Sequence, residues 1–173
     1  MGYDRVEWVV AVLFLLLAMS RGPSPDVVVY SLYTAILIVI AAIDARHRYV
    51  YSIVSYPGLL LAVALSPILS DVGLTSALAG LAIGGGVFLF FYLAGRLLYR
   101  GGEPLATGDI TIAALVGAMV GFPRVVNALF LGMVASAVLG LLVILIQRRG
   151  RRTFVPYGPG LCAGAVAAFF MAP

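Results

Sequence analysis

The sequence contains no lysine, a single cysteine and few charged residues of any kind. Only 10% of its 173 residues are charged, whereas 63% are hydrophobic. Since a soluble domain carries about a quarter charged residues, this balance excludes a soluble globular fold. The lone cysteine, Cys162, excludes an intrachain disulfide and a cysteine-based metal site. The eleven arginines are scattered through short connections and form no basic stripe, so we expect no binding to nucleic acid.

Long apolar runs take the place of the missing charge. Runs that cross or nearly cross a bilayer fall at roughly 6–20, 27–44, 53–70, 75–98, 109–122, 124–147 and 155–172. The first run lacks the basic start and small-residue cleavage site of a secretory signal, so we expect a retained helix. The sequence therefore predicts an all-α, polytopic transmembrane helix bundle that forms one domain over residues 1–173. We expect seven spans, or six if the runs on either side of Pro123 merge.

The distribution of arginine predicts the orientation of these spans. With seven spans, the side that holds the N-terminus carries nine arginines, and the other side carries only Arg21 and Arg124. Short loops rich in arginine stay on the cytoplasmic side of a membrane. We therefore expect a multi-pass protein of the cell membrane whose N-terminus is cytoplasmic.

Two of the seven acidic residues, Asp44 and Asp109, directly abut apolar runs. A charge kept so close to lipid is costly and marks a candidate functional site. The second run goes from outside to inside and ends at Asp44, while the fifth goes from inside to outside and begins at Asp109. Both carboxyl groups should therefore lie at the cytoplasmic ends of their helices, where they can meet if the helices are neighbours.

Two carboxyl groups that share a site cannot both ionise easily, so one keeps a proton while the other acts as a base. Such a pair can activate water against an amide. Helix ends favour an anion at Asp109, at a helix start, and a neutral acid at Asp44, at a helix end. This argument makes Asp109 the base and Asp44 the acid, whereas the positive charges of Arg46 and Arg48 near Asp44 favour the opposite assignment. The structural alternatives are that Asp109 only caps its helix and that Asp44 only pairs with Arg48, one turn later.

Three segments carry a family resemblance. The segment around Asp109, ATGDITIAALVGAMVG, resembles the GxGD segment of the type IV prepilin peptidases, which include the archaeal preflagellin peptidases. The segment around Asp44 is similar to that family's other catalytic stretch and reads AAIDARHRYVYSIVSYPGLLLA. The third segment, FVPYGPGLCAGA, is similar to an element near the end of bacterial members. Together they cover about residues 27–172, which leaves 6–20 as an additional N-terminal helix.

The resemblance implies an aspartic endopeptidase with Asp44 and Asp109 as its catalytic pair. Gly108 would let the chain turn tightly into the helix that Asp109 begins. The substrates would be prepilin or archaellin-type precursors, whose short basic leader is removed at the cytoplasmic face, and Glu103 could pair with that leader. The other expected partner is membrane lipid. No cofactor or metal is implied.

The sequence also departs from the family in identifiable places. Ala106 replaces the first glycine of GxGD, and Thr111 stands where many members carry a basic residue. The cysteine pairs that accompany N-methyltransferase activity in bacterial members are missing, so we expect a peptidase without that activity. His47, the only histidine, makes a poor metal site. The alternative functions are a small proton-coupled transporter and a non-catalytic membrane subunit.

Overall fold

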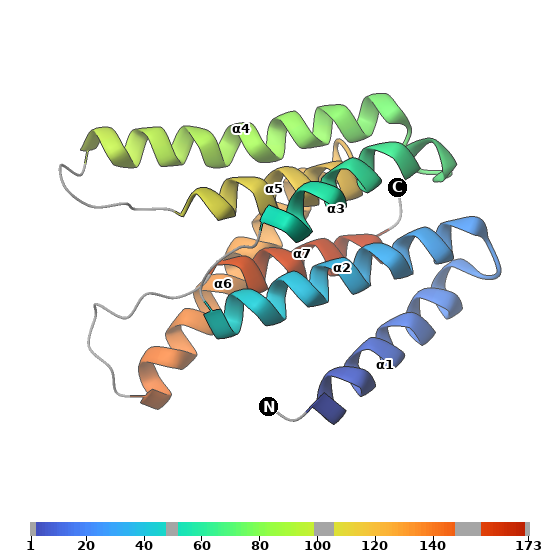
Figure 1. The fold of residues 1–173 in the computed structure, drawn as a ribbon, viewed down its shortest axis with the longest axis horizontal. Coiled ribbons are helices and arrows are strands. Elements are labelled where there is room, and N and C mark those ends of the chain that lie inside the picture. Colours follow the sequence, from blue (N-terminus) through green and yellow to red (C-terminus); the bar gives the residue numbers. More distant parts are fainter. Residues whose placement is uncertain (1–2, 48–51, 99–105, 148–156, 172–173) are drawn as a thin grey trace.

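The chain folds into a bundle of α-helices that run back and forth along one axis (Figure 1). The computed structural model describes residues 3–47, 52–98, 106–147 and 157–171. Within these ranges the α-helices are α1 Tyr3–Arg21, α2 Pro25–His47, α3 Ser52–Leu65, α4 Leu74–Leu98, α5 Thr107–Val120, α6 Arg124–Gln147 and α7 Gly158–Phe169, with a 3-10 helix, η1, at Ser66–Ile68. The predicted all-α class and the seven predicted helices are confirmed.

The chain is interrupted between α5 and α6, so the six-span alternative is wrong. Gly121 follows the last residue of α5 with a φ of 72°, a left-handed value that suits glycine and ends the helix. Pro123 comes next, after a cis peptide bond from Phe122, and α6 starts at Arg124. Glycine and proline together therefore separate two apolar runs that are only a few residues apart.

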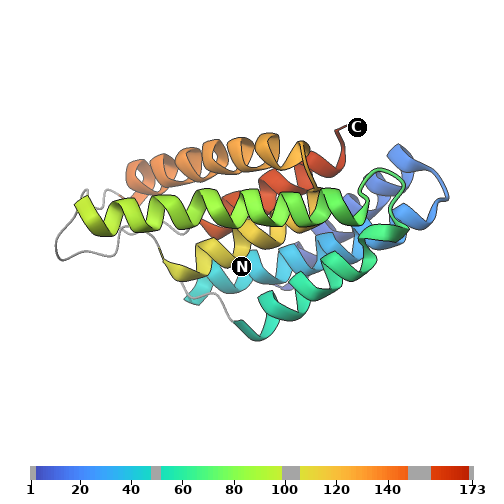
Figure 2. The same cartoon turned by 90° about the horizontal axis from the view of Figure 1, so that it is seen from above.

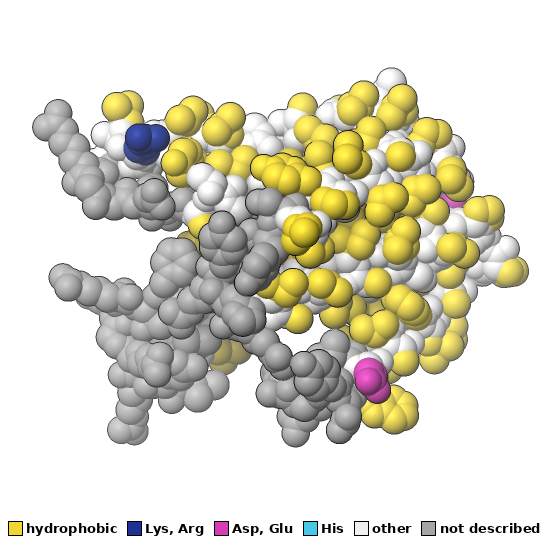
Figure 3. All heavy atoms as spheres, viewed as in Figure 1, with side chains coloured by type: hydrophobic (Ala, Val, Ile, Leu, Met, Phe, Trp, Pro, Cys, Tyr) yellow, Lys and Arg dark blue, Asp and Glu magenta, His cyan; other side chains and the backbone are white. Residues whose placement is uncertain are grey.

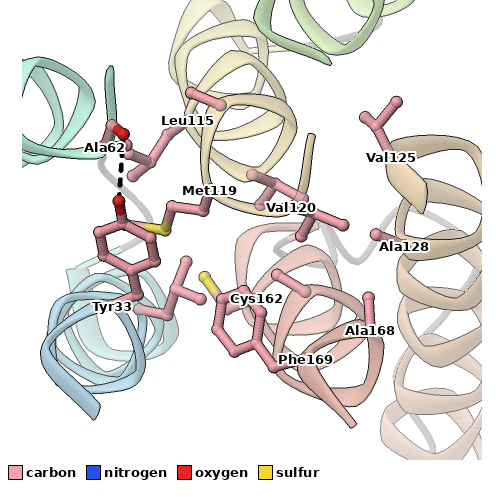
Figure 4. Close-up of a cluster of buried hydrophobic side chains, with 14 of the residues drawn as sticks. Tyr33, Ala62, Leu115, Met119, Val120, Val125, Ala128, Cys162, Ala168 and Phe169 are labelled. Carbon is pink, nitrogen blue, oxygen red and sulfur yellow. Dashed lines mark hydrogen bonds between the residues drawn. The ribbon is translucent and has the colours of Figure 1, made fainter. Parts of the chain in front are cut away.

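Helices α5 and α7 form the centre of the bundle. Nearly every side chain of α5 from Ile112 to Val120 is buried, as expected for a helix that is apolar on all sides. Helix α5 packs against α3, α4, α6 and α7, while α7 packs against α2, α5 and α6. Figure 4 shows side chains from α2, α5 and α7 gathered in this core, where the hydroxyl group of Tyr33 donates to the carbonyl of Ala62 at 3.0 Å.

Small residues bring neighbouring helices into backbone contact. Gly80 of α4 and Gly117 of α5 face each other so closely that a methyl group on either one would overlap the other's carbonyl. Gly160 and Gly164 of α7 lie in the same way against α6, around Gly132. Small residues at such positions let the backbones of transmembrane helices come close together.

Several described helices have the length and composition of membrane spans. Three are long and apolar enough to cross a bilayer, at Pro25–Ala45, Leu74–Leu98 and Arg124–Leu142, and three apolar helices are shorter. On the face shown in Figure 3, hydrophobic side chains are spread over the described surface and few charged side chains are visible. The central helix α5 has 14 residues, or about 21 Å, which is less than the roughly 30 Å of a bilayer's hydrocarbon core. Figure 2 shows α5 as a short helix alongside the longer α4.

A polar network joins five segments at one end of the bundle, called here the Asp71 end. The carboxylate of Asp71, between η1 and α4, accepts hydrogen bonds from Arg21 of α1 and Arg124 of α6, each at 2.8 Å, and from Tyr30 of α2 at 2.7 Å. Arg21 also donates to the carbonyl of Phe169 in α7 at 2.8 Å. The two arginines that were predicted to face outward are therefore both paired with one acid.

Candidate active site

Asp44 lies in the last turn of α2, at the end of the bundle opposite Asp71, and its side chain is only 5% exposed. The backbone N–H of Gly158, the first residue of α7, donates to the Asp44 carboxyl group. A methyl group on Gly158 would overlap that carboxyl group, so the two residues are in direct contact. Among the described residues, Oδ2 of Asp44 has no hydrogen-bond partner.

Asp109 lies in the first turn of α5 and is 4% exposed. Its carboxyl group accepts a hydrogen bond from the backbone N–H of Ala106, and its own N–H donates to the carbonyl of Ala106 at 3.0 Å. Ala106 is the N-cap residue, so the alternative that Asp109 is the N-cap is wrong. Its bond to the Ala106 amide is instead the reach-back half of a capping box, in which a side chain in the first turn satisfies an unpaired amide.

Ala106 and Gly108 make the entry into α5. Ala106 has φ −76° and ψ 142°, an extended conformation open to any residue, so alanine fits where the family pattern has glycine. Gly108 is the second residue of the helix, and its φ is not in the left-handed region. The turn into α5 is thus made by the extended Ala106.

The start of α7 brings the two carboxyl groups together. Gly158 contacts Asp44 on one side, and a methyl group placed on it would lie 3.1 Å from Cδ1 of Ile112, one turn after Asp109 on α5. Asp44 and Asp109 are close enough for their charges to repel each other. Neither carboxyl group forms an ion pair with a described side chain. The structure therefore gathers two buried acids at the N-termini of two helices, where the positive end of each helix dipole favours an anion.

Helix α4 extends beyond the level of the carboxyl pair. Gly84 of α4 faces the backbone of Ala113 on α5, which puts Asp109 level with Phe88 of α4. Helix α4 continues from there to Leu98, about 15 Å farther at 1.5 Å per residue. Figures 1 and 2 both show α4 extending past the start of α5. The carboxyl pair therefore lies beside the part of α4 that extends beyond the start of α5.

Some predicted residues lie outside the described part of the chain. Glu103 and Arg48 fall in segments that are not described, and the side chain of His47 is not described either. The proposed pairings of Glu103 with a leader and of Asp44 with Arg48 therefore remain predictions. Among the described residues, no group of three histidine, cysteine or acidic side chains could hold a metal ion.

Sequence reasoning did not identify Gly158 as part of the site. The third resembling segment contained the signal, because Gly158 and Pro159 lie within it. The segment contains no acidic residue or histidine, however, and what it contributes to the site is a backbone N–H together with the absence of a side chain at Gly158.

The chain is similar in sequence to curated proteins that are named for processing prepilin leader peptides. The chain is 27% identical over 171 residues to the prepilin leader peptidase/N-methyltransferase of Bacillus subtilis (strain 168), which covers 96% of this chain and 65% of that protein. It is 30% identical over 177 residues to the type 4 prepilin-like proteins leader peptide-processing enzyme of Escherichia coli O78:H11, with 98% of this chain and 61% of that protein covered. A prepilin leader peptidase/N-methyltransferase of Burkholderia pseudomallei is 30% identical over 152 residues, which are 86% of this chain and 48% of that protein.

The chain thus spans less than two thirds of the length of these curated relatives. No solved structure gives a significant match. The profile of the type IV leader peptidase family matches residues 31–141, a range that includes both Asp44 and Asp109. With most of its length matched, the chain belongs to the type IV leader peptidase family.

Proposed function

We propose that this chain is an aspartic endopeptidase that removes the leader peptide from precursors of the type IV pilin or archaellin kind. The observation that carries the proposal is that two buried carboxyl groups from helices far apart in the sequence, Asp44 and Asp109, lie near enough for their charges to interact. The family supports leader processing as the reaction. The relatives are named for leader peptide processing. Their matches extend over nearly all of this chain but over less than two thirds of each relative.

The pair supplies both halves of acid–base catalysis. The ionised carboxylate takes a proton from water as the water oxygen attacks the carbonyl carbon of the scissile amide, and the protonated carboxyl group donates to the carbonyl oxygen. Collapse of the tetrahedral intermediate breaks the C–N bond, and the proton taken from water passes to the leaving amine. Two acids that share one proton suit this sequence, because burial and mutual repulsion oppose ionisation of both.

Helix dipoles do not separate the roles of the two acids in this geometry. The argument from sequence compared two helix dipoles: the positive end of α5 beside Asp109 and the negative end of α2 beside Asp44. The structure adds the N-terminus of α7, with the Gly158 N–H donating to Asp44. Both carboxyl groups therefore have a helix start beside them. In this proposal the proton is shared by the pair, and the titration belongs to the pair as a whole.

The orientation and partners follow from the arginine distribution. The end of the bundle that holds Asp44 and Asp109 would face the cytoplasm, because nine arginines belong to that side. Arg21 and Arg124, the two on the other side, are both paired with Asp71. A precursor would present its basic leader on the arginine-rich side, with Glu103 as a candidate partner for the leader, while lipid surrounds the bundle. We propose peptidase activity alone, without the N-methyltransferase activity included in the names of some relatives.

The transporter alternative is less consistent with the other buried acids. Asp26 and Asp71 lie at the Asp71 end, where Asp26 accepts hydrogen bonds from the backbone and hydroxyl group of Ser70. The carboxyl groups of Asp26 and Asp71 already have hydrogen-bond partners. Within the described ranges they form no continuous proton path through the bundle with Asp44 and Asp109.

The test is cleavage of a pilin-type precursor with a short basic leader by the purified full chain in lipid nanodiscs, followed by intact-mass spectrometry. We expect the wild type to release the leader, and Asp44→Asn and Asp109→Asn each to lower the cleavage rate by at least about 100-fold. The same spectra, recorded with S-adenosylmethionine present, would show a methyl group on the new N-terminus if the chain transferred one. We expect none.

Asp26→Asn is the matched control, because it also removes a charge from a buried acid but at the opposite end of the bundle. It should cleave within about threefold of the wild-type rate. The proposal fails if Asp44→Asn or Asp109→Asn cleaves as fast as this control, or if folded wild type releases no leader.

A further inference from the structure

An apolar groove runs along α7 on the side that faces α1 and α2. Its volume is about 420 Å³, and all of its lining residues are apolar. Helix α1 contributes Leu13, α2 contributes three residues including Ala41, and α7 contributes five, followed by Phe170 directly after its end. The groove therefore follows α7 over its whole length.

One end of the groove lies next to the contact between Gly158 and Asp44, although neither carboxyl residue is among its lining residues. Ala41 lies one helical turn before Asp44 on α2, and Pro159 directly follows Gly158, which contacts the Asp44 carboxyl group. At the other end, near Phe170, Arg21 of α1 donates to the carbonyl of Phe169 and joins the two helices. A chain segment lying in the groove would thus have one end beside the carboxyl groups.

We propose that this groove binds the apolar helical segment that follows the scissile bond in a pilin-type precursor. The inference rests on the proposed peptidase function and adds where the substrate lies. The cleaved bond would sit at Asp44 and Asp109, and the helix after it would run along α7 toward Phe170.

The dimensions suit one face of a helix. From Pro159 to Phe170 the groove is about 16 Å long at 1.5 Å per residue, or three helical turns. Its volume is too small for a whole helix but holds the side chains of a single apolar face, which insert at positions i, i+3 or i+4, and i+7. Ala41, Ala163 and Ala167 line the groove, and such small residues let a second helix backbone come close within a membrane.

The position of the groove favours a peptide over a lipid chain. A lipid acyl chain has the right polarity for the walls but offers nothing to the carboxyl groups at the end. Oδ2 of Asp44 is buried there without a hydrogen-bond partner in the described structure. A peptide in the groove would place a polar amide group near the Asp44 carboxyl group, while its apolar side chains would contact the walls of the groove.

The first test fills the groove. Ala163→Leu and Ala167→Leu put larger side chains on its α7 wall, while Ala82→Leu adds the same bulk to an exposed position on α4 and serves as the control. We expect both groove variants to raise KM for a full precursor about tenfold with a smaller effect on kcat. The increase should be much smaller for a short peptide that ends a few residues after the cleaved bond.

The second test uses Cys162, the only cysteine of the chain, which lines the groove one turn beyond Gly158. Precursors with a single cysteine at each of the first twelve positions after the bond are oxidised with the Asp109→Asn protein in nanodiscs. The substrate helix and α7 run in the same direction in this proposal. We therefore expect the strongest disulfide near the fourth position, a weaker repeat three to four positions away, and none with Cys162→Ser.

The outcomes separate the two proposals. If wild type cleaves neither substrate, the peptidase function itself is wrong. If it cleaves both, while the groove variants behave like Ala82→Leu and cross-linking shows no positional preference, the function stands and the groove is not the docking site. Loss of copurified lipid from the groove variants with unchanged KM would assign the groove to lipid and overturn the inference.

Discussion

The α carbon of Gly158, in the first turn of α7, lies against the carboxyl group of Asp44, in the last turn of α2. The contact fixes how α7 enters the bundle, because no larger residue fits between the helix and the acid. It also aims a backbone N–H at a buried carboxylate. A residue without a side chain thereby becomes part of the polar site.

Gly158→Ala should reduce activity more than stability. The added methyl group overlaps the Asp44 carboxyl group, and displacement of a catalytic group by about 1 Å can cost roughly 100-fold in rate. We expect kcat to fall between about 10-fold and 100-fold in the leader-release assay. Gly86→Ala is the control, since a methyl group there meets nothing within 4 Å. Equal kcat for the two variants would show that the contact has no role in catalysis.

The contact between α4 and α5 predicts a different result for Gly117→Ala. A methyl group at this position overlaps the carbonyl of Gly80, so the two helices must separate. Overpacking of this kind costs about 1–3 kcal/mol. The midpoint of thermal unfolding, followed by far-UV circular dichroism, should fall by several degrees. Gly86→Ala should unfold at the wild-type temperature, and a Gly117→Ala protein that does the same would contradict the close packing.

The network at Asp71 predicts a loss of stability in acid. Burial alone would raise the pKa of Asp71, but hydrogen bonds from Arg124, Tyr30 and Arg21 outweigh it and lower the pKa to about 2. An unfolded aspartate has a pKa near 4, so ionised Asp71 stabilises the fold by roughly 2.5 kcal/mol above about pH 4. This stabilisation should disappear as the pH falls from about 4 to about 2.

Thermal unfolding between pH 2 and pH 7 measures this effect. Asp71→Asn should unfold at a lower temperature at pH 7, because Arg21 and Arg124 would keep buried charges without their acid. The difference from wild type should shrink toward pH 2. Glu7→Gln, which removes an exposed acid, provides the comparison. A constant difference between Asp71→Asn and wild type across this range would contradict a lowered pKa.

Ala106→Gly restores the family's glycine and should change little. Ala106 is already in an extended conformation at φ −76°, which glycine does not adopt more easily than alanine. We expect the cleavage rate to stay within about twofold of wild type. An increase of tenfold or more would mean that the departure at this position limits activity through something other than backbone conformation.

Much of the fold follows from local sequence. Apolar runs gave the helices to within a few residues at most ends, and Gly121 with Pro123 ended α5 through rules that depend on single residues. The directions of the second and fifth runs were enough to put Asp44 and Asp109 at one end of the bundle, where the structure shows them. The α7 helix came out shorter than its run, because an apolar run does not mark where its helix begins.

The remaining features depend on which helices are neighbours. Helix α5 is apolar on every side, so no stripe in its sequence distinguishes the faces toward α3, α4 and α7. Gly158 lies between Asp44 and Ile112 because α7 packs against both α2 and α5 at this point. This position could not be derived from any one segment. The Asp71 network was missed for the same reason, since its donors come from three separate helices.

The recessed position of Asp109 sets a minimum reach for anything cleaved there. Asp109 is level with Phe88, and α4 rises about 15 Å above it to Leu98. An extended peptide advances about 3.3 Å per residue, so four to five residues separate the carboxyl pair from the rim of α4. A shorter leader would leave its charged N-terminus beside α4, before the last described residue of that helix, Leu98. Shortening a leader one residue at a time should therefore produce a threshold in cleavage at about this length, whatever its sequence.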